Sequence, residues 1–112
     1  MPGGESRSMK TYELKTLPVF ENDLNEIIDY IAGTLGNPIA AYAMVDEVEK
    51  AINDRLQSAE SFEQYELNDN HEYPYYKIRV KNYTIYYVVI GNVMEVRRII
   101  YSRRNIHLRD WR

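Results

Sequence analysis

Alternation of apolar and polar side chains dominates the C-terminal third of the chain. Between Tyr75 and Arg104 the residues Val, Ile and Tyr are dense, and they suit a pleated, half-buried surface. Lys81-Asn82 and Gly91-Asn92 interrupt the apolar runs, and Asn and Gly tolerate the positive φ that two-residue hairpin turns require. The pattern therefore predicts three strands joined by two tight turns.

Two-residue turns also predict the strand register, because side chains alternate between the two faces of a sheet. Pairing outward from the turns sets Lys77 opposite Tyr86 and Tyr86 opposite Arg97. The predicted core face then carries Tyr76, Ile78, Val80, Tyr83, Ile85, Tyr87, Val89, Met94, Val96 and Ile100. The predicted opposite face carries Lys77, Arg79, Thr84, Tyr86, Glu95 and Arg97, with Ile99, Val88 and Tyr75 at its margins.

Arg98 does not fit this register, which points it at the core face. Either a β-bulge intervenes, or the long stem of Arg98 lies along the rim of the core with its guanidinium in water. A sheet that buries one side and gathers Lys, Arg, Tyr and Glu on the other presents a cationic face.

The N-terminal half has helical periodicity. Residues 10–17 alternate as a short strand, expected at the sheet edge. Pro18 suits a first helical turn, and an apolar stripe at 3- and 4-residue spacing follows it to Gly33 and Gly36. A second stripe runs from Pro38 to about Ser58, and so short a connection makes the two helices an antiparallel hairpin. The acidic outer faces of both helices are expected to be solvated.

The predicted fold is therefore α+β, with the order β-α-α-β-β-β and a helical hairpin packed on one face of a small antiparallel-rich sheet. Residues 1–8 are rich in Pro, Gly and Ser and are interpreted as a disordered leader or an expression remnant. Residues 9–112 form a single domain. Residues 60–74 are a long connection anchored by aromatic side chains, and the basic segment 101–112 either closes over the sheet or is ordered by a partner.

Composition limits the compartments, the membrane association and the metal sites that can be expected for this chain. The 112 residues include no cysteine, which excludes disulfides and thiolate metal sites, and a reducing cytoplasm is expected. No apolar run reaches the ~20 residues of a membrane span. His71 and His107 are the only histidines and lack ligand-spaced partners, so we expect no metal and no cofactor.

Charge is divided unequally along the chain. From Tyr75 onward nine Lys/Arg stand against two acids, a net charge of +7, and the preceding residues carry five against fifteen, a net charge of −10. One interpretation is an anionic partner for the sheet. The other is that a basic sheet complements acidic helices within one fold.

A cationic face with interleaved tyrosines suits RNA chemistry. Arg and Lys donors stabilise the charge that develops on a phosphodiester in a displacement reaction, and the 2′-OH of RNA is a built-in nucleophile. Lys77, Arg79, Tyr86, Arg97 and an arginine from the tail are the candidates for such a metal-free ribonuclease. Alternatively, these residues are charged only because alternate strand positions face water.

From Tyr12 to about Asn105 the chain resembles the RelE/ParE superfamily of toxins from bacterial type II toxin–antitoxin pairs. The matching pieces, in family order, are F-x-x-D-L-x-E-I-x-D-Y-I (20–31), Y-K-I-R-V (76–80), Y-T-I-Y-Y-V-V (83–89) and V-M-E-V-R-R-I-I-Y-S-R-R-N (93–105). The resemblance implies a toxin neutralised by a cognate antitoxin, whose extended segment wraps the helices and covers the sheet. It also implies one of two activities: cleavage of mRNA on the ribosome, or inhibition of DNA gyrase.

Site residues follow from the RelE-like motif. Lys77 and Arg79 match two basic strand positions used in cleavage, and Arg104 matches an arginine after the last strand. Thr84 and Asp110 depart from the motif, standing where many cleaving members have Arg and Tyr, and Tyr101 replaces a histidine seen in many ParE-like relatives. The general acid is hypothesised to be Tyr86 or Tyr87, and the base Glu95.

The first hypothesis is ribosome-dependent mRNA cleavage by 2′-OH attack. Its catalytic candidates are Lys77, Arg79, Tyr86, Arg97 and Arg104, and its nucleic-acid contacts are Lys81, Arg98, Arg103 and Arg109. The alternatives are a gyrase inhibitor that binds without cleaving and an inactive relative that binds only the antitoxin.

Overall fold

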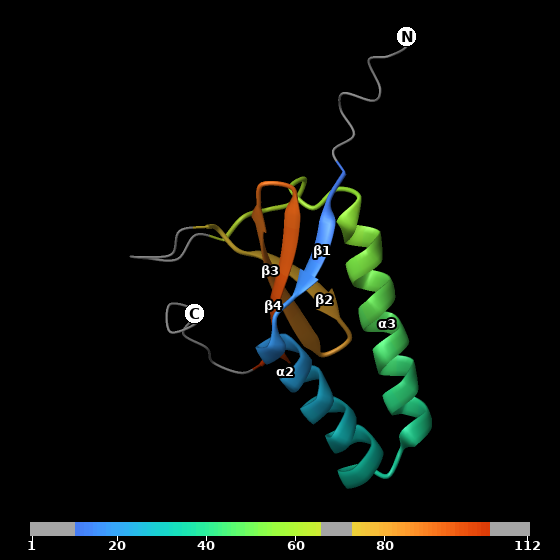
Figure 1. Ribbon diagram of the computed structural model, residues 1–112. Coiled ribbons are helices and arrows are strands. Elements are labelled where there is room, and N and C mark those ends of the chain that lie inside the picture. The colour runs from blue at the N-terminus through green and yellow to red at the C-terminus, as the bar shows by residue number, and fades with distance from the viewer. Residues whose placement is uncertain (1–10, 66–72, 104–112) are drawn as a thin grey trace.

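The computed structural model describes residues 11–65 and 73–103. They form a four-stranded sheet with the order β1-β4-β3-β2 and a helical hairpin beside it (Figure 1). The strands are β1 (Glu13–Thr16), β2 (Tyr76–Val80), β3 (Tyr83–Ile90) and β4 (Val93–Tyr101). The helices are α2 (Pro18–Asp29), which continues into the π-helical turn η1 (Tyr30–Thr34), and α3 (Pro38–Leu56). The predicted α+β class and element order are confirmed.

Both helices begin where the sequence places a proline. Pro18 and Pro38 each stand in a first turn, where the missing N–H leaves no hydrogen bond unmade. Asn37 caps α3, because its Oδ1 accepts a hydrogen bond from the Ala40 N–H at 3.1 Å. Gly36 has a φ of +64°, a left-handed conformation that glycine adopts without steric cost. This glycine lets the chain leave η1 and enter α3 through a short loop.

β1 is an edge strand, as predicted, but it pairs in parallel with β4, whereas β2, β3 and β4 form an antiparallel ladder. β1 is short and covers only Val93–Val96 of β4. Farther along β4, the Asp23 carboxylate of α2 accepts a hydrogen bond from the Ile99 N–H at 3.2 Å. A helix side chain thus satisfies a backbone donor that lies beyond the end of β1.

Both hairpin turns contain two residues, and Lys81 and Gly91 take the positive φ values of +53° and +64°. The predicted pairing of Lys77 with Tyr86 is confirmed. The register of the β3–β4 ladder shifts between Tyr86 and Tyr87, so Tyr86 lies opposite Arg98. The predicted pairing of Tyr86 with Arg97 is therefore wrong, because a β-bulge inserts one extra residue into β4.

The bulge reverses the expected facing of two isoleucines. Ile99 packs with Ile85 in the core, whereas Ile100 lies on the opposite face of the sheet. The sequence-based assignment of Ile100 to the core and Ile99 to the outer margin is thus wrong beyond the bulge. Of the two explanations offered for Arg98, the bulge is the one found.

The core lies between the helical hairpin and one face of the sheet. The rest of the predicted core face is confirmed, with Tyr83 and Val89 partly buried at its border. The rings of Tyr76 and Tyr87 stack at 5.0 Å between centroids with an interplanar angle of 10°. The helices contribute Phe20, Ile27, Met44, Val48 and Ile52.

The opposite face of the sheet, here called the outer face, is less polar than the sequence predicted. Tyr75, Tyr86, Val88 and Ile100 form a second buried cluster there. Tyr75 and Val88, which the sequence placed at the margins, are fully buried. The centre of the outer face is therefore a buried aromatic and aliphatic cluster, and charged side chains surround it. The sequence had predicted a cationic face there.

The Tyr87 hydroxyl fastens the end of α3 to the sheet. It donates a hydrogen bond to the Ala59 carbonyl at 2.7 Å and accepts one from the Arg55 guanidinium at 2.9 Å. The same guanidinium donates to the Lys77 carbonyl at 3.3 Å and lies 3.5 Å from the centroid of the Phe62 ring. One buried phenol therefore joins β3, β2 and the chain after α3.

We predict that Tyr87→Phe lowers the free energy of unfolding by about 1–3 kcal/mol, because the ring stays but the Ala59 carbonyl loses its partner. Denaturation in urea measures the change. Tyr42→Phe, on an exposed side chain, is the matched control and should leave stability unchanged. Equal stability of the two variants would show that the hydroxyl contributes nothing net.

Candidate functional site

Two of the predicted catalytic cations, Lys77 and Arg97, lie on the outer face with Tyr86 between them. Lys77 pairs with Tyr86 across the β2–β3 ladder, and Arg97 is the extra residue of the bulge in β4. The Lys77 Nζ lies 4.0 Å from the centroid of the Tyr65 ring and 5.9 Å from that of Tyr86. Rings thus flank the ammonium group, a geometry in which the ring faces attract the cation.

Arg97 is held by two partners. Its Nε donates to the Glu95 carboxylate at 2.8 Å, and a terminal nitrogen donates to the Tyr75 hydroxyl at 3.1 Å. The Tyr75 ring in turn meets the Tyr86 ring edge to face, at 6.4 Å between centroids. A continuous line of contacts therefore runs from Arg97 through two tyrosines to Lys77.

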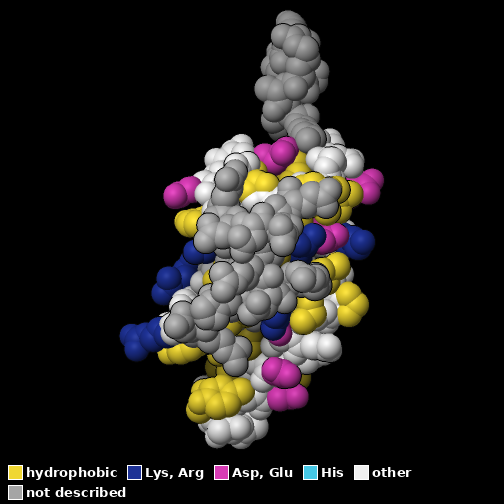
Figure 2. Space-filling view, turned by 90° about the vertical axis from the view of Figure 1, so that its left-hand side faces the viewer, with side chains coloured by type: hydrophobic (Ala, Val, Ile, Leu, Met, Phe, Trp, Pro, Cys, Tyr) yellow, Lys and Arg dark blue, Asp and Glu magenta, His cyan; other side chains and the backbone are white. Residues whose placement is uncertain are grey.

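We call this group the outer-face cluster and define it as Lys15, Tyr65, Tyr75, Lys77, Tyr86, Glu95 and Arg97. Lys15 belongs to it because its Nζ lies 3.7 Å from the second oxygen of Glu95. Figure 2 views the molecule from this side and shows Lys and Arg side chains toward both the left and the right margin of the view. The cluster holds three cations and one carboxylate.

Glu95 is the one carboxylate of the cluster. Its side chain is only 10% exposed, so its charge interacts strongly with Arg97. Burial opposes ionisation of Arg97, but hydrogen bonds with Tyr75 and Glu95 outweigh it and raise the pKa of the guanidinium. Burial also raises the pKa of Tyr86. At neutral pH, Arg97 is charged and Tyr86 is a neutral phenol.

Arg79 does not join the cluster. Its backbone lies opposite Thr84, as predicted, but its Nε donates to the Lys81 carbonyl of its own hairpin at 3.0 Å. The side chain lines a hollow that Glu47 and other residues of α3 share. The Lys81 side chain also points toward α3, since its Nζ lies 3.2 Å from a Glu47 oxygen. The expectation that Lys77, Arg79 and Arg97 gather at one place is thus only partly met.

Two other predicted nucleic-acid contacts, Arg98 and Arg103, lie apart from the cluster. Arg98 makes a two-point ion pair with Asp23, at 2.7 and 3.0 Å, which joins β4 to α2. Arg103 is exposed and lines a hollow of about 460 Å³ with Tyr30, Tyr83 and Tyr101. Arg104 and Arg109 lie outside the described residues.

Sequence reasoning missed Tyr65 as a member of the cluster and placed Tyr75 only at the margin of this face. They face each other in an isolated antiparallel bridge, with backbone hydrogen bonds of 2.7 and 3.0 Å. The bridge brings part of the long connection after α3 against β2. The only signal in the sequence is the aromatic content of that connection, which predicted anchoring but not the partner.

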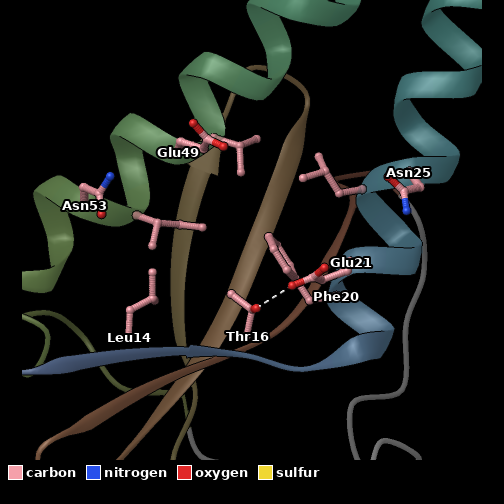
Figure 3. A pocket seen from close by; sticks show the side chains of 10 residues that line it. Leu14, Thr16, Phe20, Glu21, Asn25, Glu49 and Asn53 are labelled. Atoms are coloured by element: carbon pink, nitrogen blue, oxygen red, sulfur yellow. Dashed lines mark hydrogen bonds between the residues drawn. The ribbon is translucent and has the colours of Figure 1, made fainter.

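A second candidate site, which the sequence did not predict, is a groove between β1, α2 and α3 (Figure 3). Its volume is about 420 Å³, and its apolar lining includes Leu14, Phe20 and Ile52. Polar side chains such as Glu21 and Glu49 stand at its rim, and the Thr16 hydroxyl donates to Glu21 at 2.7 Å. An apolar floor with an acidic rim suits a segment that carries both hydrophobic and basic residues.

Within residues 11–65 and 73–103, no three His, Cys, Asp or Glu side chains stand close enough together to hold a metal ion. In the same part of the chain, no helix combines the length and the hydrophobicity needed to cross a membrane.

Two helices beside a mixed four-stranded sheet form a fold that this chain shares with a solved toxin–antitoxin structure. The solved "Chromosomal ParDE TA system from P. aeruginosa" is similar with a TM-score of 0.69 and 17% identity, over 83% of this chain and 98% of that one. The archaeal RelE–RelB complex from Pyrococcus horikoshii aligns with a TM-score of 0.49 and 18% identity, over 85% and 99% of the two chains.

No curated protein matches the sequence significantly. The family model described as "ParE toxin of type II toxin-antitoxin system, parDE" matches residues 14–106. This chain therefore belongs to the ParE toxin family. The resemblance to the RelE/ParE superfamily that was inferred from the sequence is confirmed.

The buried tyrosines predict a loss of stability in alkali. Burial raises the pKa values of Tyr83, Tyr86 and Tyr87, and burial with a hydrogen bond to Glu60 raises the pKa of Tyr12 to about 12. Because these folded-state values exceed the unfolded value of about 10, their contribution is complete below pH ~10 and is lost as the pH rises through the folded values.

Absorbance titration of tyrosinate, combined with urea denaturation at each pH, measures this effect. We expect a subset of tyrosines to ionise only as the protein unfolds. A single transition of all eleven tyrosines at the pKa of free tyrosine, with the fold intact, would contradict the assignment.

Proposed function

We propose that this chain is the toxin of a type II toxin–antitoxin pair and acts by binding a protein target without cleaving RNA. The ParE resemblance implies that the target is DNA gyrase. Family membership gives the coarser part of this conclusion: a ParE family toxin, which implies a cognate antitoxin as its partner.

The pairing of the cations supports a non-hydrolytic mode of action. Arg97 is bound to Glu95, Arg79 to a carbonyl of its own hairpin, and Arg98 to Asp23. A phosphodiester in its transition state needs donors that converge on one point and are already aimed there. Here each guanidinium is aimed at an internal acceptor, and the three acceptors lie in different places.

The state of Tyr86 supports the same conclusion. General acids and bases work best when their pKa lies near the working pH. Burial moves the pKa of Tyr86 upward, away from neutrality. The Lys77 ammonium, 5.9 Å from the Tyr86 ring centroid, does not offset the burial. A phenol in this position is suited to packing and cation–π contacts.

Ribosome-dependent mRNA cleavage is the second candidate function, and one observation favours it. Lys77 and Arg97 flank a tyrosine on the same face, and an incoming phosphate could compete with Glu95 for Arg97. In this mechanism the 2′-OH attacks the adjacent phosphorus, the 5′-oxygen leaves, and the product is a cyclic phosphate. The experiment below distinguishes the two functions.

The test is induction of the chain in bacterial cells, followed by measurement of plasmid supercoiling and of mRNA 5′ ends. We expect altered supercoiling and DNA damage signalling while mRNA stays intact. New 5′ ends that appear within coding regions before any change in supercoiling would overturn the proposal in favour of cleavage.

The double variant Lys77→Ala/Arg97→Ala tests whether these two side chains are needed for toxicity, as RNA cleavage requires. Under the proposed function we expect growth inhibition within a few-fold of the original chain, because neither side chain is then needed for chemistry. Under the cleavage mechanism, loss of even one aligned donor costs on the order of 10²–10³ in rate. Thermal unfolding of the purified variant controls for loss of the fold, since Arg97 is partly buried.

We further propose that the antitoxin occupies the groove of Figure 3. Leu14→Glu places a charge on the apolar wall of the groove, next to the acidic rim. We expect antitoxin binding to weaken by on the order of 30-fold or more, the loss typical of a central interface residue, in a titration by calorimetry. Tyr101→Glu is the matched control, because Tyr101 is 44% exposed and Leu14 is 43% exposed. Equal affinity for both variants would place the antitoxin elsewhere.

A further inference from the structure

The hollow that Arg103 lines lies where the end of β4 meets α2 (Figure 1). Its volume of about 460 Å³ falls within the range of ~300–1,000 Å³ that is typical of small-molecule sites. The buried side chains of Ile27 and Ile99 contribute to an apolar lining. The hollow shares no lining residue with the outer-face cluster or with the groove at Leu14. It is therefore a separate site.

Three tyrosines from three elements line this hollow. They are Tyr30 of η1, Tyr83 of β3 and Tyr101 of β4. The rings of Tyr83 and Tyr101 meet edge to face, with 5.7 Å between centroids and an interplanar angle of 64°. Tyr30 and Tyr101 are nevertheless 50% and 44% exposed. Aromatic side chains that keep an exposed surface beside an apolar hollow can stack on a flat aromatic ligand.

Two exposed side chains of opposite charge stand in the same lining. Glu26 comes from α2 and Arg103 from the turn after β4. Among residues 11–65 and 73–103, neither of them has a hydrogen-bond or ion-pair partner. Asp23 also lines the hollow, but its carboxylate already accepts hydrogen bonds from Arg98 and from the Ile99 N–H. Glu26 is therefore the carboxylate that can accept from a ligand, and Arg103 is the guanidinium that can bind an anion.

We propose that this hollow binds a guanine nucleotide. The base stacks on the tyrosines, its Watson–Crick edge faces Glu26, and its phosphate binds Arg103. Such an arrangement uses every polar group of the lining that is not already paired inside the fold. The ligand is either a free nucleotide or a guanine in a single strand of nucleic acid, since both present the same base and phosphate.

The carboxylate of Glu26 selects guanine among the four bases. Guanine carries two adjacent donors, N1–H and N2–H, that match the two oxygens of a carboxylate. Adenine and cytosine each place an acceptor beside their donor, and uracil flanks its one donor with two acceptors. Each of these three bases would therefore turn a lone pair toward the negative charge.

The opposite charges of the lining also exclude simpler ligands. A purely cationic ligand would meet Arg103, and a purely anionic one would meet Glu26 beside Asp23. A guanine nucleotide carries its hydrogen-bond donors at one end and its negative charge at the other. An arginine side chain binds phosphate through charge-assisted hydrogen bonds, which are among the strongest that a protein makes.

This inference is independent of how the toxin acts on its target. Its test is calorimetric titration of the full chain with GMP, AMP, CMP and UMP. We expect GMP to bind on the order of 10-fold or more tightly than the other three, the difference that hydrogen bonds to a charged acceptor make. Equal binding of all four nucleotides would overturn the proposal, and so would their equal displacement by inorganic phosphate.

The variant Glu26→Gln tests the recognition of the base. An amide offers one acceptor and one donor, as the edge of adenine requires, so the affinities for GMP and AMP should come within a few-fold of each other. Asp29→Asn is the matched control, because Asp29 is an exposed acid one helical turn later and does not line the hollow. An unchanged preference for GMP in Glu26→Gln would contradict the assigned role of Glu26.

The variant Arg103→Ala tests the contact with the phosphate. We expect on the order of 10-fold weaker binding of GMP and unchanged binding of guanosine, which has no phosphate. Lys50→Ala removes an exposed positive charge from α3 and should change neither affinity. Glu26 and Arg103 are both exposed, so these variants should fold, and circular dichroism checks this. Equal losses for GMP and guanosine would show that Arg103 does not bind the phosphate.

A short single strand identifies the source of the ligand. The probe is a hexanucleotide of uridines that contains one guanine. Tighter binding of this strand than of GMP assigns the hollow to nucleic acid, and equal binding assigns it to a free nucleotide; both outcomes support recognition of guanine. If neither GMP nor the strand binds better than its adenine counterpart, the proposal is wrong, whatever the target of the toxin.

Discussion

One extra residue in β4 decides which side chains meet on each face of this sheet. The bulge at Arg97 sends Ile99 into the core and Ile100 to the outer face. It also turns Arg98 toward the edge of the sheet, where Asp23 receives both its guanidinium and the Ile99 N–H. Without the bulge, strict alternation would aim Arg98 at the core. A buried guanidinium lacking a partner costs far more than the one ladder pairing that a bulge gives up.

The same bulge connects the packing of the helices to the chemistry of the outer face. Asp23 fixes α2 against β4, and the bulged Arg97 reaches Glu95 and Tyr75. Two of the basic side chains of the sheet are therefore paired within the fold. The ion pairs of Arg98 with Asp23 and of Lys81 with Glu47 each join the basic sheet to an acidic helix. The opposite charges of the two halves of the chain serve, at least at these two places, to hold one fold together. An exposed anionic partner is not needed to explain these two contacts.

The sequence predicted the elements well because their causes are local. Pro18 and Pro38 start helices by their fixed φ, and two-residue turns at Lys81 and Gly91 dictate the register near them. It failed where the cause is distant. The misfit of Arg98 pointed to a bulge as one of two explanations, but alternation did not choose between them. Nor did it reveal the ion pair of Arg98 with Asp23, 75 residues away in the chain. The groove and the Tyr65–Tyr75 bridge likewise arise only when separate segments meet.

The position of Arg79 shows that the alternation of side chains along a strand does not by itself locate a charged group. The alternation of side chains along β2 correctly placed the Arg79 backbone opposite Thr84, on the same side of the sheet as Lys77. β2 is an edge strand, however, and a long side chain on an edge can bend around it. The guanidinium takes the nearby carbonyl of Lys81, which the tight turn presents. Catalysis depends on where the charged atoms lie. The two-residue period determines only the face toward which the Cβ atom of an arginine points, and the guanidinium lies several rotatable bonds beyond it. The backbone register therefore supports the fold more strongly than it supports any chemistry assigned to the outer face.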